Sequence, residues 1–177
     1  MKYSKIVPVA FRSLFGSEQV RYENRFEIMR FISRKLGFRL YNKNLRWFKD
    51  EEYIKVWSGF PSANEEVHER RFTLYYLAKS VSSVVGDTVE CGVFHGAGSF
   101  LILSANSGEK HHHIFDSFEG LSEPELIDDA SDGRVARWRR NDLAVAGDVV
   151  QDNLSAFDCV TYYKGWIPER FDEVSNN

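Results

Sequence analysis

The sequence has few of the residues that crosslink a chain or anchor it in a membrane. Its two cysteines, Cys91 and Cys159, are too few for a disulfide framework or a zinc site, which is typical of the reducing cytosol. No apolar run approaches the roughly 18 residues of a membrane span. Because Pro8 and Arg12 break the apolar stretch near the N-terminus, we expect no signal peptide and a cytoplasmic location.

An excess of positive charge is also missing. The formal net charge is −3, which argues against nucleic acid or an anionic membrane as the main partner. Hydrophobic residues make up 43% and aromatic residues 15% of the 177 residues. This composition is that of a globular protein, and the length is sufficient for one domain with its own core.

Residues 1–64 form the first of two predicted parts, a helical and aromatic accessory segment. Apolar residues recur at helical spacing from Glu18 to Leu36, and Gly37 is a natural end for that helix. An aromatic cluster follows: Trp47, Phe48, Tyr53 and Trp57. These rings favour packing against a core or a subunit interface, as in a homo-oligomer, over the alternative of a wall that stacks on a sugar acceptor.

Residues 65–177 form the second predicted part, in which helices and strands alternate. We expect helices over 65–84, 99–107 and 143–157, and strands over 88–93, 111–116 and 159–163. Crossovers of this length join parallel neighbours, so the fold class is α/β with three parallel strands. Three strands leave an unfinished sheet, and we therefore expect that the C-terminal half of the domain is absent.

A glycine-rich turn joins the first predicted strand to the next helix. Gly92, Gly96 and Gly98 have no Cβ atom, so the backbone can approach a ligand closely. In open parallel sheets, ligands bind beyond the carboxyl ends of the strands, which is where this turn lies. The spacing alone does not identify the ligand, because such turns also bind NAD, NADP and nucleotides.

Two carboxylates narrow the choice of ligand. Glu90 disfavours a pyrophosphate and suits a cofactor that carries an ammonium and a sulfonium. Asp116 ends the second predicted strand, where an acid accepts hydrogen bonds from ribose hydroxyls. No lysine or arginine lies in the turn to hold a phosphate. The pattern predicts S-adenosylmethionine as the cofactor, and the alternative is that each acid is an ordinary surface ion-pair partner.

The segment VECGVFHG, residues 89–96, resembles the VECGVWRGGS signature of the macrocin O-methyltransferase-like family. The resemblance continues through FDSFEGL at 115–121 and YKGW at 163–166, and covers about residues 65–174. It departs from the signature at Phe94, His95, Ala97 and Gly98. The resemblance implies a Rossmann-like class I methyltransferase that transfers a methyl group to a hydroxyl of a sugar or sugar-bearing metabolite.

The resemblance also implies individual roles. Glu90, Gly92 and Gly96 would line the methionine part of the cofactor. Asp116 would hold the ribose, and Ser117 and Phe118 would lie near the adenosine. Val93, Phe94, Gly98 and Ser99 complete the implied cofactor-binding set. A Mg²⁺ ion and a catalytic base are implied on later strands, beyond residue 177, so we expect an incomplete chain, inactive alone, with no metal ligand of its own.

Two other functions stay open. A short-chain reductase that uses NAD(P) would fit the glycine spacing, but that class needs a Tyr-x-x-x-Lys pair, which Tyr162-Tyr163-Lys164 does not provide. A non-catalytic fragment would bind a protein partner or nothing.

Two clusters invite a metal interpretation, and we reject it for both. His111, His112 and His113 alternate between faces of a predicted strand, so they cannot converge on one ion. The acids Asp128, Asp129 and Asp132 lack the ligand spacing of a calcium loop. We expect them to lie in a solvated loop whose charge is balanced by Arg134, Arg137, Arg139 and Arg140.

Overall fold

The computed structural model describes residues 15–37, 47, 49–61, 68–125, 128 and 138–174. The chain divides into two compact units, residues 1–54 and 55–177. The boundary expected from the sequence, between residues 64 and 65, lies outside the described residues, as does Phe48 of the aromatic cluster. That boundary therefore stays a prediction, and each unit is described by itself.

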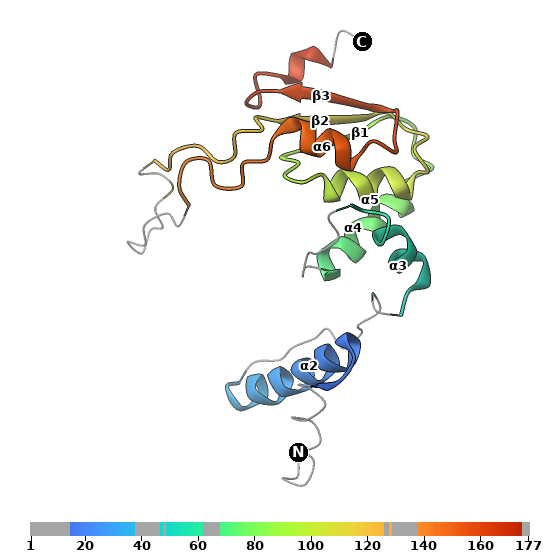
Figure 1. Ribbon diagram of the computed structural model, residues 1–177, viewed down its shortest axis with the longest axis vertical. Helices are drawn as coiled ribbons and strands as arrows, with labels where there is room; N and C mark the ends of the chain where they lie inside the picture. The colour runs from blue at the N-terminus through green and yellow to red at the C-terminus, as the bar shows by residue number, and fades with distance from the viewer. Residues whose placement is uncertain are drawn as a thin grey trace. The chain divides into compact units, whose positions relative to one another are not determined.

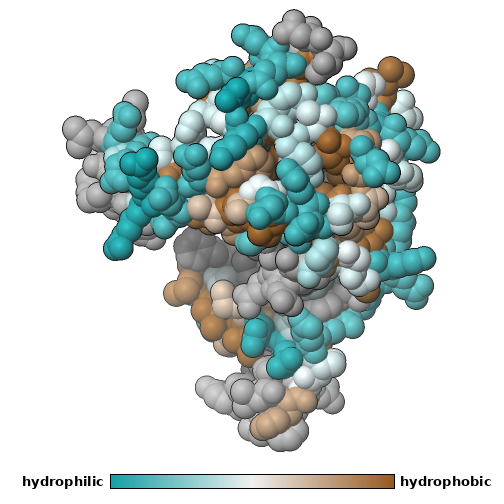
Figure 2. All heavy atoms as spheres, turned by 45° about the horizontal axis from the view of Figure 1, so that its top comes forward, coloured by the Kyte–Doolittle hydropathy of each residue, from teal (hydrophilic) through white to brown (hydrophobic). Residues whose placement is uncertain are grey.

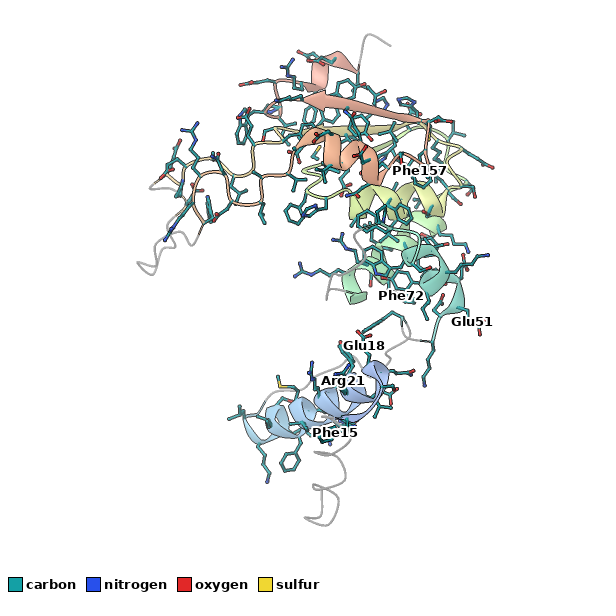
Figure 3. The ribbon with its side chains drawn as sticks, viewed as in Figure 1. Phe15, Glu18, Arg21, Glu51, Phe72 and Phe157 are labelled. Carbon is teal, nitrogen blue, oxygen red and sulfur yellow. The ribbon has the colours of Figure 1, made fainter. Side chains whose placement is uncertain are left out.

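The first unit contains α2, Glu18–Lys35, which matches the helix expected from the sequence. Ser17 begins it, because the Ser17 hydroxyl accepts a hydrogen bond from the backbone N–H of Val20 at 3.4 Å. Acidic Glu18 in the first turn and two basic residues in the last turn complement the helix dipole (Figure 3). Tyr22 of α2 meets the ring of Trp47 edge-on, with centroids 5.1 Å apart.

A second helix, α3, Glu51–Trp57, spans the boundary between the two units. Asp50 begins it, since one carboxylate oxygen of Asp50 accepts from the backbone N–H of Tyr53 at 2.8 Å. The side chains of Trp47, Tyr53 and Trp57 are all buried. Their burial agrees with the packing role that the sequence favours for these three rings.

The second unit is built on a parallel sheet of three strands in chain order (Figure 1). The strands are β1, Thr88–Cys91, β2, His112–Asp116, and β3, Val160–Lys164. Cys91 pairs with Phe115, and Phe115 pairs with Tyr163. The α/β class and the three parallel strands expected from the sequence are confirmed.

Helical elements connect these strands, precede the first strand and follow the last. The elements are α4, His68–Ser80, α5, Ala97–Ala105, α6, Gly147–Asn153, and a single 3₁₀ turn, η4, Phe171–Glu173. The helix expected over 143–157 is only α6, because Asn141 and Leu143 have positive φ angles and Ala146 is extended. A right-handed helix cannot include such residues, so it begins at Gly147. The helix expected over 65–84 is described only from His68 and ends at Ser80.

The core of this unit lies between the sheet and α5. Leu101, Leu103, Ile114 and Val150 have no exposed surface. The ring of Phe100 contacts Phe60 and Phe157, with centroids 5.3 and 5.7 Å away, and Phe157 lies beside α5 in Figure 3. Truncating a leucine in such a core to alanine costs about 2–5 kcal/mol.

The two faces of the sheet have different neighbours. Alternation along the strands places Glu90 and His112 on the face that α5 covers, where Ser99 contacts both. Phe115 points to the other face, where the ring of Phe171 in η4 meets it edge-on at 5.2 Å. In Figure 1, η4 lies beyond β3, on the opposite side of the strands from α4 and α5.

The three consecutive histidines bond to different groups. His111 contacts Thr161 at 2.8 Å, His112 contacts Ser99 at 2.9 Å, and His113 contacts the Tyr163 hydroxyl at 2.9 Å. His112 and His113 are buried and lie on opposite faces of β2. This arrangement follows the alternation expected from the sequence.

Candidate cofactor-binding site

A pocket of about 280 Å³ lies where the carboxyl ends of the three strands meet. Cys91 at the end of β1, Asp116 at the end of β2 and Gly165 just after β3 all line it. The strand ends are held together, since Gly92 N–H donates to Phe115 O at 2.9 Å and Gly165 N–H to Asp116 O at 3.0 Å. The pocket therefore occupies the edge at which open parallel sheets bind ligands.

Asp116 joins the loops that follow β1 and β2. One carboxylate oxygen accepts from the backbone N–H of Val93 at 2.7 Å, and the other accepts from the backbone N–H of Phe118 at 2.7 Å. A carboxylate has about four acceptor positions, so two hydrogen bonds leave capacity for a ligand. Asp116 is thus fixed in orientation by backbone donors and still able to accept ligand hydroxyls.

The glycine turn after β1 needs its glycines because of its backbone conformation. Gly92 and Gly96 have φ angles of 82° and 87°, a left-handed conformation that side chains disfavour. The turn packs on the α6 region, since a Cβ atom at Gly96 would be in van der Waals contact, at 3.4 Å, with Val150 and Leu154. Asn153 of α6 donates to the backbone carbonyl of His95 at 2.9 Å, which ties this helix to the turn.

The carboxylate of Glu90 points to α5 and does not line the pocket. It accepts the hydroxyl proton of Ser99, and a Cβ atom at Gly98 would collide with it. Burial raises the pKa of Glu90, while hydrogen bonds from Ser99 and the charge of Arg71 act in the opposite sense. The Asp116 carboxylate also raises this pKa, as expected for two acids at the same end of the sheet.

The loop after β2 forms a second wall. The Ser117 hydroxyl accepts from the Glu119 N–H at 3.2 Å, and Phe118 has a φ of 57°. Leu121 exchanges backbone hydrogen bonds of 2.8 Å with Asn141 and Asp142, so the long segment between them is closed at its base. A Cβ atom at Gly120 would meet the backbone of this closure, which explains the glycine there.

Four of the ten predicted binding residues line the pocket: Gly92, Phe94, Asp116 and Ser117. The other six are not among the residues that line it: Glu90, Val93, Gly96, Gly98, Ser99 and Phe118. Their contacts are with the protein, as shown by Val93 on Asp116 and Ser99 on Glu90. The structure therefore divides the predicted set into residues that line this pocket and residues that contact other parts of the protein.

Sequence reasoning missed most of the apolar wall. Leu121, Leu143, Trp166 and Ile167 line the pocket and are 36%, 62%, 47% and 43% exposed. Apolar side chains are visible at the surface among hydrophilic ones in Figure 2. A signal for Trp166 was present, because the carboxyl end of the third parallel strand must join the edge that holds the glycine turn.

Of the three acids in the predicted acidic cluster, only Asp128 is among the described residues. Asp129, Asp132, Arg134 and Arg137 lie outside the described residues. Asp128 is exposed and accepts from the backbone N–H of Glu125 at 2.8 Å. Within the part of the chain that the structure describes, no three histidine, cysteine, aspartate or glutamate side chains could together hold a metal ion.

Comparison with known proteins decides the family. The family model for macrocin O-methyltransferase (TylF) matches residues 69–176, which is more than half of the chain. The chain belongs to the macrocin O-methyltransferase family. The matched segment contains all three strands and the whole pocket, so the resemblance seen in the sequence is confirmed.

Solved structures similar to this macrocin O-methyltransferase family member include two methyltransferases. The O-methyltransferase NovP is 27% identical with a TM-score of 0.43, and the match covers 59% of this chain and 49% of NovP. The calicheamicin methyltransferase CalS11 is 13% identical with a TM-score of 0.48, and the match covers 77% of this chain and 68% of CalS11. This chain thus spans about half the length of NovP. The comparison with curated proteins finds no match.

Among the described residues, no helix is long and apolar enough to cross a membrane.

Proposed function

We propose that the pocket binds S-adenosylmethionine and that the protein serves methyl transfer to a hydroxyl of a sugar-bearing small molecule. Membership of the macrocin O-methyltransferase family supports methyl transfer. The single observation that supports the cofactor is Asp116, which lines the pocket beside the glycine turn and is fixed there by two backbone N–H groups.

The lining of the pocket favours a nucleoside without phosphate. No lysine, arginine or histidine is among the described residues that line it. A phosphate would lack a cationic partner there and would face the Asp116 carboxylate. Apolar side chains such as Trp166 and Leu143 suit a planar base, and a carboxylate suits ribose hydroxyls.

The proposed roles follow from the position of each residue. Gly92, Phe94, Asp116 and Ser117 contact the cofactor, while the other six predicted residues support the glycine turn and the Asp116 carboxylate. Bound S-adenosylmethionine supplies an electrophilic methyl group on a sulfonium. The part of this chain is to bind and orient that group so that an acceptor oxygen can approach in line.

A sugar-bearing acceptor is proposed from the family and from a pocket that is open enough for a small molecule. The described residues do not fit a Mg²⁺ site, since they provide no set of three ligands. We therefore assign no step to a metal, and the ligands that the resemblance implies beyond residue 177 stay a prediction.

Calorimetry with S-adenosylhomocysteine and with NADPH tests the proposal. We expect the chain to bind S-adenosylhomocysteine and not NADPH. Asp116→Asn should weaken binding by about tenfold, because the amide replaces one acceptor by a donor that faces a backbone N–H. Asp152→Asn, on the exposed surface of α6, is the matched control and should bind like the original chain.

Two results would contradict the proposal. Binding of NADPH in preference to S-adenosylhomocysteine would indicate a reductase. Equal affinities of the Asp116→Asn variant and the original chain, with equal melting temperatures, would remove Asp116 from the site.

A further inference from the structure

Four polar side chains form a continuous chain of hydrogen bonds beneath the glycine turn. They are Thr88, His112, Ser99 and Glu90, here called the Glu90 relay. The Thr88 hydroxyl lies 2.8 Å from Nδ1 of His112, and Nε2 of His112 lies 2.9 Å from the Ser99 hydroxyl. The Ser99 hydroxyl in turn donates to the Glu90 carboxylate. His112 and Ser99 have no exposed surface.

The proton count fixes the direction of each bond. A serine hydroxyl has one proton, and Ser99 gives it to Glu90. Nε2 of His112 must then carry a proton in order to bond to the Ser99 oxygen. Burial, with the neighbouring His113 and His111, lowers the pKa of His112 to about 4, so the ring is neutral at pH 7. Nδ1 therefore carries no proton, and the Thr88 hydroxyl gives its one proton to Nδ1 at 2.8 Å in preference to the His111 carbonyl oxygen at 3.3 Å.

The relay ends at the first turn of α5. Gly96, the residue before this helix, has no side chain to cap its free N–H groups. The Glu90 carboxylate fills this role from β1, because both the hydroxyl and the backbone N–H of Ser99 bond to it. Gly98 leaves the space that this carboxylate occupies. A negative charge at this position also complements the helix dipole.

We propose that the Glu90 relay is a positioning device: it holds the Glu90 carboxylate as the cap of α5 and thereby fixes the glycine turn at the cofactor site. Glu90 thus acts on the cofactor through the backbone of the turn. This inference rests on the proposed function only for its effect on cofactor binding. The geometry of the relay itself can be measured without any ligand.

The other face of β2 offers an internal comparison. Nε2 of His111 lies 2.8 Å from the hydroxyl of Thr161, the same distance as in the pair of Thr88 and His112. His111 is exposed, and its hydrogen bond with Thr161 includes no residue of the Glu90 relay. Thr161→Val therefore removes a threonine–histidine bond of the same kind without touching the relay.

The first experiment is ¹⁵N-edited NMR of the histidine rings in the full chain at pH 7. We expect His112 to be neutral with its proton on Nε2, and the Ser99 amide to exchange slowly. In Thr88→Val both signatures should be lost, while Thr88→Ser should restore them and Thr161→Val should leave them unchanged. A proton on Nδ1 would mean that the relay runs the other way, from a protonated Glu90, and would overturn the proposal.

The second experiment is calorimetry of the same variants with S-adenosylhomocysteine. Thr88→Val and Ser99→Ala should bind about fivefold more weakly than the original chain, with Thr88→Ser and Thr161→Val within about twofold. Unchanged affinity in both weakened variants would overturn the link to the site. If the original chain binds no S-adenosylhomocysteine, the proposed function fails, and NMR alone decides whether the relay caps α5.

Discussion

Glu90 and Asp116 lie at the same edge of the sheet, yet their carboxylates face different groups. Asp116 lines the pocket with two backbone N–H groups bonded to it, whereas Glu90 turns toward the first turn of α5. The difference follows from position along the strands and not from the face, since Glu90 pairs in register with Ile114, two residues before Asp116 at the end of β2. One acid lines the pocket, and the other bonds to the helix that follows the glycine turn.

Gly98→Ala tests this placement of Glu90. A Cβ atom at Gly98 would collide with the Glu90 carboxylate, so we expect the free energy of unfolding to fall by about 1–3 kcal/mol. Gly147→Ala is the matched control, because Gly147 also lies in a helix and its added Cβ would be 3.6 Å from the Phe118 ring. That variant should be neutral or more stable by up to about 1 kcal/mol. Urea unfolding of both variants gives the comparison, and equal stabilities would show that Glu90 lies elsewhere.

The sequence predicts which residue types surround the site better than it predicts where they point. The position of Asp116 could be predicted because an acid at the end of a strand is recognisable in the sequence, without knowledge of its hydrogen-bond partners. The contacts of Glu90 depend on the register between β1 and β2, and a register shift of one residue would move its side chain to the other face. The sequence predicts β1 to extend to Val93, whereas the strand ends at Cys91.

The helix α6 and the residue after it contact the glycine turn. Val150 and Leu154 pack within 3.4 Å of the position of a Cβ on Gly96, and Asn153 donates to the carbonyl of His95. Asn153 is only 8% exposed, so its amide has little access to water. Loss of this bond leaves a backbone carbonyl in the turn without its protein donor.

Asn153→Ala should therefore lower the free energy of unfolding by about 1–2 kcal/mol and weaken binding of S-adenosylhomocysteine a few-fold. Gln151→Ala, on the exposed side of the same helix, is the control and should change stability by less than about 0.5 kcal/mol. Thermal unfolding and calorimetry report the two effects. If both variants behaved alike, α6 would not support the turn through this bond.

The order and type of the elements could be read from the sequence, but several helix ends could not. Hydrophobic periodicity and glycine positions identify β1, α5 and β2 because these segments are short and apolar. The start of α6 is set by positive φ angles at Asn141 and Leu143, which close the loop onto Leu121. That closure joins residues about twenty positions apart, so no local pattern reports it.

The free energy of unfolding of the whole molecule depends on pH because of His112. Its pKa is about 4 in the folded chain and 6.5 ordinarily. Between these values the unfolded chain binds a proton that the folded chain does not, so the free energy of unfolding falls as pH falls, by about 2 kcal/mol at pH 5. Glu90 acts in the opposite sense, because its raised pKa lets the folded chain bind a proton first.

Comparison of the original chain with His112→Gln isolates the histidine contribution, since Glu90 is present in both. We expect the difference in unfolding free energy between them to shrink by about 2 kcal/mol from pH 7 to pH 5. Urea unfolding at the two pH values measures it. A difference that does not change with pH would mean that folded His112 titrates normally.

The strand order β1-β2-β3 has a consequence for the newborn polypeptide. Each strand of the described sheet hydrogen-bonds only to the strand before or after it in the chain. Pairings between sequence neighbours close the shortest available loops and form fastest. As synthesis proceeds from the N-terminus, β1 with α5 can receive β2 and later β3 as each leaves the ribosome, and among the described residues that line the pocket, Gly165, Trp166 and Ile167 emerge last.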